Sequence, residues 1–294
     1  PPPTLPEDLE GRLLPPEGLP GLLARWDLEG VDVRGLRVLE RPAAADVEKY
    51  RKAKALLTAW LRDRAKCALT ERYFAERWLR HARRNASLPN LRFLSDEPRR
   101  EGAAILISSG PSTEEALEAL APASRNRYTM ALPGPAALLA RGGVRLDAVL
   151  STDGGWWNTV HFQAVARHYP GVPLYCPFSI HPAIARGAVK PVFFFDDEAW
   201  AEEYGRGPAE RERIRANWIP QSGTAATAAL SVLRRLGFSR VHTTGIDFSL
   251  TPWRCHASSN GTEERFFTEC RRGKPFDTLY HRAFPLALRR EAEG

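Results

Sequence analysis

Short apolar runs alternate with amphipathic helical patterns from Gly102 onward. Such alternation is typical of βαβ units, whose strands lie parallel in one sheet with helices packed on its faces. The runs predict strands at residues 104–108, 128–132, 148–151, 174–176, 192–195 and 240–244, and the patterns between them predict helices at 113–120, 136–140, 158–168 and 224–236. Phe193, Phe194 and Phe195 are consecutive, as expected of a strand buried on both faces. The predicted fold class is α/β, a Rossmann-like and mainly parallel sheet with helices on both faces.

The first hundred residues follow a different pattern. Residues 1–40 are rich in Pro, Gly and Leu, which predicts a lead-in segment. Apolar positions spaced by three and four then predict one helix from Asp46 and a second helix from Thr70 to Asn85. We therefore expect an N-terminal lead-in and helical segment over residues 1–100, and the α/β domain over residues 101–294.

Composition narrows the class of protein. The chain of 294 residues is 43% hydrophobic and 26% charged, as in soluble globular proteins. No apolar run approaches the roughly 18 residues that span a bilayer, so we predict no membrane span. The four cysteines lack CxxC spacing and are too few for a disulfide framework, which favours a reducing cytoplasm; they are Cys67, Cys176, Cys255 and Cys270. Cys255 has no partner at metal-ligand spacing, so we predict no metal site.

The formal net charge of +7 raises the question of a nucleic-acid partner. Of the 42 basic residues only six are lysines, and the basic residues are spread along the chain with short clusters only. A nucleic-acid interface concentrates its basic residues on one face or stripe. The sequence therefore predicts no nucleic-acid partner.

Small residues follow the first predicted strand of the α/β domain. Ser109, Gly110, Pro111 and Ser112 stand where this strand ends and a helical pattern begins. In open α/β sheets ligands bind at this edge, and the free N–H groups of a helix N-terminus favour an anion. A simpler interpretation is a helix cap, since Ser112 and Glu115 fit the S-x-x-E capping box.

A second turn of the same kind lies further along the chain. Ser222, Gly223 and Thr224 open a predicted helix, and the strand after that helix ends in Gly245 and Asp247. Two such turns in one α/β chain predict a pocket for a phosphorylated ligand.

Asp153 ends the third predicted strand and precedes two glycines. Its carboxylate would coordinate Mg²⁺ or accept a hydrogen bond from a ribose hydroxyl, while a plain Asp-Gly-Gly turn is the simpler interpretation. Trp156 and Trp157 follow, where an indole would stack on a base or sugar ring. We nevertheless expect at least one of the two rings to pack in the core.

His256 lies in a polar loop after the Asp247 strand end, a suitable place for general acid–base chemistry. A solvent-exposed loop histidine is the competing interpretation. Four further histidines of the α/β domain are interpreted as structural or exposed: His161, His168, His181 and His281. Of these, His181 with Pro182 is expected to form part of a pocket wall.

Taken together, these motifs resemble the MptE-like family, which includes the Maf flagellin glycosyltransferases and 6-hydroxymethylpterin diphosphokinases. The resemblance covers roughly residues 70–265 and rests on the two turns, on Asp153, on Gly245 and Asp247, on residues 139–147 and on Arg77, Trp78 and Asn85 upstream. Leu146 departs from the family pattern, which has proline there, and the pair Trp156–Trp157 has no counterpart. The second half is also similar to bacterial sialyltransferases that use CMP-sialic acid.

The resemblance implies a cytoplasmic glycosyltransferase that uses a CMP-activated nonulosonic sugar and a hydroxyl of a flagellin-like protein. Ser109–Ser112 and Ser222–Thr224 would bind the phosphate and ribose, Asp153 and Asp247 would position hydroxyl groups, and His256 would be the catalytic base. The alternative is a Mg²⁺-dependent diphosphokinase that transfers pyrophosphate from ATP to a hydroxymethylpterin, although the chain lacks a Walker-type lysine. The second alternative is a non-catalytic binding module.

Overall fold

The structure is a computed structural model that describes residues 47–221, 223–248, 256–258, 260–261, 266, 268–275 and 278–279, apart from the side chains of residues 47–50, 63–69 and 71. The predicted lead-in segment and Ser222 lie outside the described residues. The chain divides into two compact units, Pro1–Glu76 and Arg77–Gly294. The predicted domain boundary near residue 100 stays a prediction.

The helix α2 runs from Val47 to Ala86 without interruption. The prediction of two separate helices, from Asp46 and from Thr70, is therefore wrong. Its 40 residues contain neither glycine nor proline, so nothing in the backbone chemistry ends the helix between the two apolar patterns. Among the described residues, no helix is both long and apolar enough to cross a bilayer.

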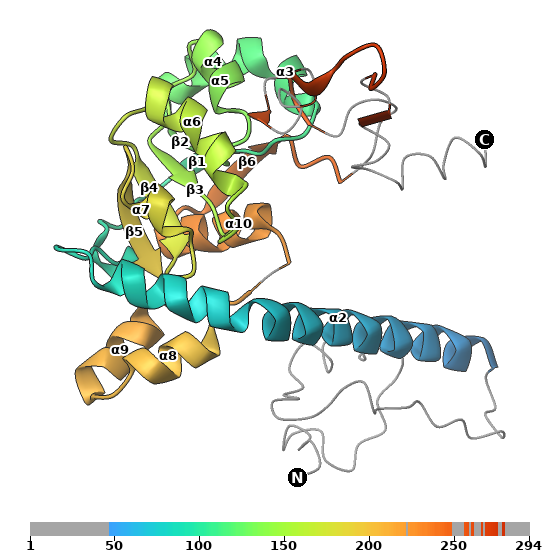
Figure 1. The fold of residues 1–294 in the computed structure, drawn as a ribbon, viewed down its shortest axis with the longest axis vertical. Helices are drawn as coiled ribbons and strands as arrows, with labels where there is room; N and C mark the ends of the chain where they lie inside the picture. The colour runs from blue at the N-terminus through green and yellow to red at the C-terminus, as the bar shows by residue number, and fades with distance from the viewer. Residues whose placement is uncertain are drawn as a thin grey trace. The chain divides into compact units, whose positions relative to one another are not determined.

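Six strands form one parallel sheet in the order β5-β4-β3-β2-β1-β6 (Figure 1). They are β1 (Ala103–Ile107), β2 (Tyr128–Ala131), β3 (Ala148–Leu150), β4 (Pro173–Pro177), β5 (Lys190–Phe194) and β6 (Arg240–Thr244). The predicted fold class and all six strands are confirmed, with ends shifted by at most two residues. The direction of strand succession reverses between β1 and β6, and a reversal of this kind is where doubly wound sheets bind ligands.

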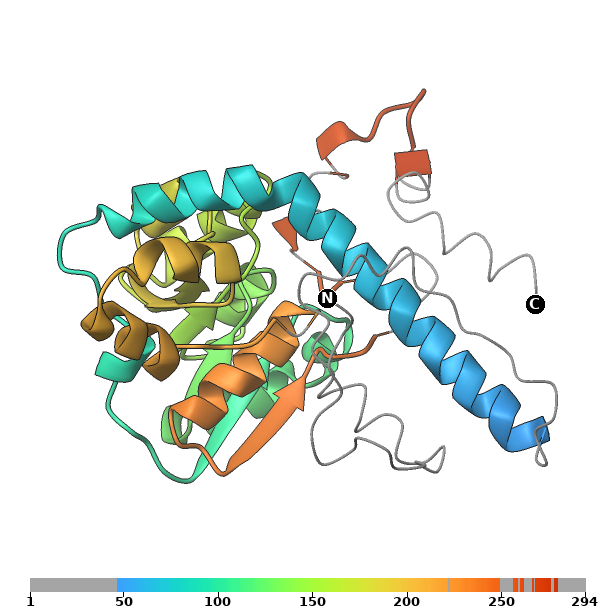
Figure 2. The same cartoon turned by 90° about the horizontal axis from the view of Figure 1, so that it is seen from below.

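Helices of this unit connect the strands and cover both faces of the sheet. They are η4 (Leu94–Asp96), α3 (Ser112–Glu115), α4 (Leu117–Asn126), α5 (Ala136–Arg141), α6 (Asn158–His168), α7 (Pro182–Ala185), α8 (Glu198–Tyr204), α9 (Pro208–Ala216) and α10 (Ala225–Arg235). Figure 2 shows α10 beside β6. The predicted helix 113–120 is wrong as one element, because the chain forms α3 and α4 on either side of Ala116.

Alternation along the strands divides the core between the two faces. In β1, Leu106 packs with Val232 of α10 on one face, whereas Ile105 and Ile107 pack with Leu139 of α5 on the other. In the three consecutive phenylalanines, Phe194 joins the α10 face, and Phe193 and Phe195 join the opposite face. The predicted strand buried on both faces is therefore confirmed, and each buried phenyl ring contributes about 1.5–3 kcal/mol of transfer free energy.

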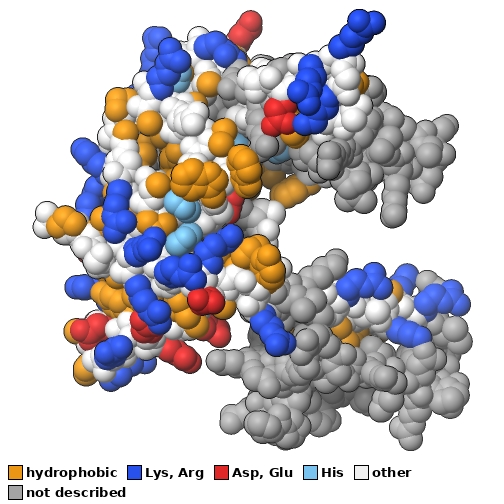
Figure 3. All heavy atoms as spheres, in the orientation of Figure 1, with side chains coloured by type: hydrophobic (Ala, Val, Ile, Leu, Met, Phe, Trp, Pro, Cys, Tyr) orange, Lys and Arg blue, Asp and Glu red, His pale blue; other side chains and the backbone are white. Residues whose placement is uncertain are grey.

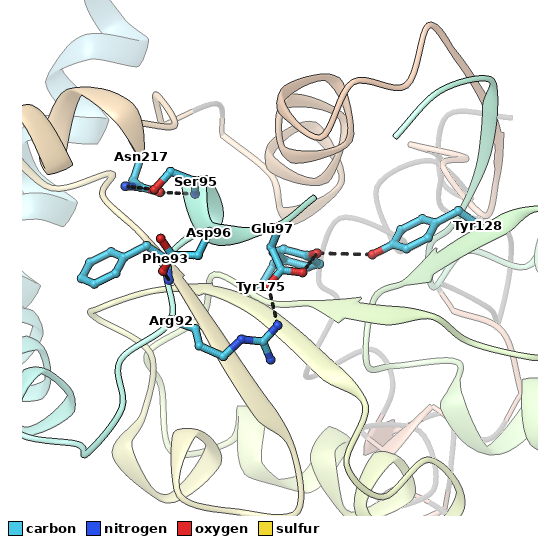
Figure 4. A network of polar contacts seen from close by, with 8 residues as sticks. All are labelled: Arg92, Phe93, Ser95, Asp96, Glu97, Tyr128, Tyr175 and Asn217. Carbon is cyan, nitrogen blue, oxygen red and sulfur yellow. Dashed lines mark hydrogen bonds and ion pairs between the residues drawn. The ribbon is translucent and has the colours of Figure 1, made fainter. Parts of the chain in front are cut away.

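A partly buried polar network lies on the α10 face of the sheet (Figure 4). Tyr128 of β2 donates to the Tyr175 hydroxyl of β4 over 3.4 Å, and Tyr175 donates to Oε2 of Glu97 over 3.2 Å. Arg92 in turn pairs with Glu97 Oε1 at 2.5 Å. Each buried hydroxyl thus has a partner, which removes most of the cost of burying it.

Candidate functional site

Two loops meet at the switch point between β1 and β6. The Ser108 N–H donates to the Thr244 carbonyl over 2.9 Å, and the Gly110 N–H donates to the Gly245 carbonyl over 2.9 Å. The predicted turn at Ser109–Ser112 and the predicted strand end at Gly245–Asp247 are thus joined along their backbones.

Glycine is required on both sides of this contact. A Cβ atom at Gly110 would lie 2.3 Å from Asp247 Oδ2 and 2.6 Å from the Gly245 carbonyl oxygen. Gly245 has a φ of +73°, and a Cβ there would lie 2.6 Å from the Ser108 carbonyl oxygen. The close approach and the left-handed backbone explain why both positions are glycine.

Asp247 binds the first turn of α3. Its Oδ2 accepts a hydrogen bond from the Ser112 N–H over 3.0 Å, and its Oδ1 accepts one from the Ser112 hydroxyl. The same hydroxyl accepts the Gly245 N–H over 3.0 Å. The Asp247 carboxylate thus offsets the partial positive charge of the α3 N-terminus. The Ser112 amide, one of the amides expected to bind an anionic ligand, is already hydrogen-bonded within the protein.

The capping box of Ser112 and Glu115 is wrong. Pro111 is the N-cap of α3 and makes no side-chain cap bond, and Ser112 is the first helical residue. The Ser112 side chain is instead directed to Asp247, 135 residues further along the chain.

The segment that carries His256 packs on the same turn. The Ala257 N–H donates to the Ser109 carbonyl over 2.7 Å, and the Ser258 N–H donates to Glu114 Oε1. A Cβ atom at Gly134, just after β2, would lie 2.4 Å from Ser109 Oγ and 2.7 Å from Asn260 Nδ2. The loop that follows β2 thus meets both segments at the carboxyl edge of the sheet.

His161 of α6 interacts through charge with two of the predicted site residues, Asp153 and His256. Burial lowers the pKa of His161; the nearby His256 lowers it further, and Asp153 opposes the shift through its negative charge. A Cβ atom at Gly261 would lie 3.4 Å from His161 Nδ1, which places the His256–Gly261 segment against the start of α6. Imidazoles and carboxylates are the side chains that accept and pass protons near neutral pH, and Asp153 and His256 both act on His161 through their charges.

His161 is not among the site residues predicted from the sequence, and its interpretation as structural or exposed stays a prediction. Its position gives it access to the site: α6 begins at Asn158, shortly after Asp153, so the first turn of α6 lies at the ligand edge of the sheet.

The loop after β3 is held by its own side chains. Asp153 Oδ1 accepts the Gly155 N–H over 2.7 Å, and the buried Asn158 donates to Ser151 Oγ over 2.9 Å and to the Asp153 carbonyl over 2.7 Å. The Asp-Gly-Gly turn of the simpler interpretation is therefore present. Asp153 itself is exposed.

Trp156 and Trp157 do not pack in the core, so that expectation is wrong. Their side chains are 62% and 61% exposed. The Trp156 ring meets His181 edge to face at 5.2 Å, so the predicted pocket-wall histidine contacts an exposed indole.

The second predicted turn is described from Gly223 onward. Gly223 has a φ of +78°, and Thr224 is the N-cap of α10, where its Oγ1 accepts the Thr227 N–H over 3.2 Å. Both residues are exposed. Their role in binding a nucleotide stays a prediction.

A further carboxyl group stands after β5. Burial raises the pKa of Asp196 to about 7, and the neighbouring Asp197 carboxylate adds to the shift. Asp197 caps α8 by accepting the Trp200 N–H over 2.7 Å. Within the part of the chain that the structure describes, no group of three or more His, Cys, Asp and Glu side chains is placed to hold a metal ion.

A six-stranded parallel sheet with loops joined at its switch point defines a Rossmann-like α/β protein. This chain belongs to the MptE-like family, described as 6-hydroxymethylpterin diphosphokinase MptE-like, whose model matches residues 76–252. The resemblance inferred from the sequence is thus confirmed for this family, while the similarity to sialyltransferases stays a prediction.

Among solved structures, a Maf glycosyltransferase from Magnetospirillum magneticum AMB-1 has a TM-score of 0.50 with this chain at 13% sequence identity. The match covers 73% of this chain and 37% of that protein, so this chain corresponds to little more than a third of its length. At this identity the similarity shows a shared fold. A comparison with curated proteins finds no match.

Proposed function

We propose that this chain is a nucleotide-dependent transferase that moves a nonulosonic sugar from its CMP-activated form to a hydroxyl of a protein such as flagellin. Membership of the MptE-like family supports a transferase. The solved neighbour with the same fold is named a glycosyltransferase, which supports glycosyl transfer.

The observation that carries the proposal is the packing of Gly261, from the segment that carries His256, against His161: a Cβ atom at Gly261 would lie 3.4 Å from His161 Nδ1, and His161 interacts through charge with His256 and Asp153. In the proposed step, the acceptor hydroxyl passes its proton to the His256 imidazole as its oxygen bonds to the anomeric carbon of the sugar. The bond from that carbon to the phosphate oxygen breaks, and its electron pair leaves on CMP. A positioned base of this kind contributes about 10²–10⁴-fold in rate.

The nucleotide would bind at the turn Ser109–Ser112, with Ser222, Gly223 and Thr224 as its second contact. Because Asp247 already bonds the Ser112 amide and hydroxyl, we assign the phosphate contact to the Ser109 hydroxyl. Asp247 then acts on the nucleotide through the turn that it holds in place.

The alternative, a diphosphokinase acting on a hydroxymethylpterin, is favoured by the name of the family. It would use ATP with Mg²⁺, and Asp153 and Asp247 are its expected carboxylate ligands. Each oxygen of Asp247 already accepts a hydrogen bond from Ser112, so this pair fits a shared Mg²⁺ poorly in the present arrangement. We therefore derive no step through Mg²⁺. A non-catalytic binding module is the second alternative.

A thermal-shift titration with CMP and with ATP, each with and without Mg²⁺, tests the proposal. At a hundredfold excess over Kd a ligand adds about 2.7 kcal/mol, which raises the Tm of a domain of this size by several degrees. We expect CMP alone to raise the Tm of the wild-type chain and of the control Ser239→Ala, in which an exposed serine is replaced. The Tm of Ser109→Ala should rise much less. A shift with ATP that requires Mg²⁺ would favour the diphosphokinase, and no shift with either nucleotide would favour the binding module.

A further inference from the structure

Three aromatic rings from separate segments form a row beside the Asp153 loop: Trp156, His181 and His81. Trp156 meets His181 at 5.2 Å between ring centroids, and His181 meets His81 at 5.1 Å, both edge to face. The rings come from the loop after β3, from the N-cap of α7 and from α2, all within the unit Arg77–Gly294. We call these three residues the ring row.

The backbone around the ring row is fixed by buried hydrogen bonds. His81 Nδ1 donates to the Ser179 carbonyl over 3.2 Å, and the fully buried Asn85 donates to the carbonyls of Phe178 and Ile180 over 2.8 Å each. A Cβ atom at Gly154 would lie 2.4 Å from the Ser179 carbonyl oxygen, so the Asp153 loop is packed directly on this segment. The ring row is therefore preorganised, which lowers the entropic cost of binding a ligand.

His181 presents a hydrogen-bond donor. Its Nδ1 accepts the Ala183 N–H over 3.2 Å, so in the neutral ring the proton is on Nε2. Burial is the first cause that lowers the pKa of both His81 and His181, and the positive charges of Arg77 and Arg84 lower both further. Arg77 and Arg84 stand four residues before and three residues after His81 in α2, so the two arginines share the helix face of His81.

On the face in view in Figure 3, histidine side chains lie between hydrophobic side chains and a group of Lys and Arg side chains. Trp156 supplies an apolar ring that is 62% exposed, next to a donor and a positive field. An apolar ring beside an imidazole N–H donor and a helix face that carries two arginines matches a ligand that carries an oxyanion on a ring.

We propose that Trp156, His181, His81, Arg77 and Arg84 form a subsite for the oxyanion of a ring-bearing substrate, with the ring against Trp156. The inference rests on the proposed function, in which the ligand is the sugar of the donor and the oxyanion is its carboxylate. The same chemistry would receive a phosphate group of a different substrate. Asp153 lies three residues before Trp156, so the subsite adjoins the proposed catalytic group.

The test uses the full chain and two substitutions of exposed residues, Arg84→Gln and Trp156→Ala. Their matched controls are Arg167→Gln, an exposed arginine in the last turn of α6, and Trp157→Ala, an indole that is also 61% exposed. The probes are free N-acetylneuraminic acid, its methyl ester and inorganic pyrophosphate, with Kd measured by calorimetry. Circular dichroism and Tm confirm that each variant is folded.

We expect N-acetylneuraminic acid to bind at least tenfold more weakly to Arg84→Gln and Trp156→Ala than to the two controls, and the ester to bind weakly to every protein. If pyrophosphate binds in a way that depends on Arg84 while N-acetylneuraminic acid does not bind, the oxyanion subsite stands. The proposed sugar transfer is then overturned. Folded variants that bind the acid and pyrophosphate as the controls do, or a wild-type chain that binds neither, would overturn the subsite. CMP-sugar turnover unaffected by Arg84→Gln and Trp156→Ala would also overturn the subsite, while the transferase proposal would stand.

Discussion

Two regions at the carboxyl edge of the same sheet use their polar groups differently. In the switch-point region, Gly110, Ser112, Gly245 and Asp247 bond to one another. In the β3–α6 region, Asp153 and Trp156 are exposed, and His161 interacts electrostatically with His256. The first region is therefore chiefly a scaffold for the edge of the sheet, whereas we infer that the second presents side chains to a ligand. Substitutions at these four bonded residues should therefore chiefly change stability, whereas substitutions in the second region should change binding or turnover.

The largest expected effect is on stability, in the switch-point region. Gly245→Ala places a side chain at a φ of +73° and 2.6 Å from the Ser108 carbonyl oxygen. The left-handed backbone costs roughly 1–2 kcal/mol, and overpacking adds about 1–3 kcal/mol. Urea denaturation measures the loss. Gly143→Ala is the matched control, since Gly143 has a φ of +69° with nothing within 4 Å of the added Cβ, and an equal loss in both variants would contradict the close packing.

The Asp247 carboxylate accepts hydrogen bonds from Ser112, whereas the Asp196 carboxyl is buried beside the like charge of Asp197. Its pKa is raised from the ordinary 3.8 to about 7, so the folded chain binds the proton more tightly than the unfolded chain. The protonated carboxyl therefore stabilises the fold below about pH 4, and this stabilisation is lost as the pH rises to about 7. At 1.36 kcal/mol per pKa unit, the free energy of unfolding falls by at most about 4 kcal/mol. Unfolding free energies of wild type and Asp196→Asn at pH 4 to 8 measure this. A pH dependence that is the same in both proteins would refute the assignment.

Asp247 and Asp153 allow a direct test of scaffold against ligand edge. Asp247→Ala removes the partner of the Ser112 amide and hydroxyl and should lower the free energy of unfolding by about 1–2 kcal/mol. Asp153→Ala removes an exposed carboxylate and should lower it by no more than about 0.5 kcal/mol. Chemical denaturation of both variants measures the difference. The comparison fails if Asp153→Ala is the more destabilised variant.

The sequence predicts what depends on local pattern. Strands of alternating or continuous apolar residues form the parallel sheet as expected, and the predicted helix 158–168 coincides with α6. The predicted turn at residues 109–112 and the predicted strand end at residues 245–247 lie together at the switch point. These features follow from periodicity and from the rule that parallel strands share one carboxyl edge.

Features that depend on distant residues could not be predicted in this way. Ser112 and Glu115 fit a capping box, yet Asp247 offers Ser112 a charged acceptor from another strand end. At least one ring of the pair Trp156–Trp157 is expected in the core, but both side chains are exposed, and the Trp156 ring lies against His181. The short helices α7, α8 and α9 were missed, since 4 to 9 residues give too few turns for a periodic pattern.

The most direct test of the account is turnover of a CMP-activated nonulosonic acid, measured as CMP release in the presence of a hydroxyl-bearing acceptor protein. His256→Ala is compared with the wild-type chain and with His168→Ala, an exposed histidine at the end of α6. The account predicts a loss of about 10²–10⁴-fold for His256→Ala, with an unchanged Tm, and wild-type turnover for His168→Ala. Full turnover by a folded His256→Ala chain would contradict the proposed catalytic base.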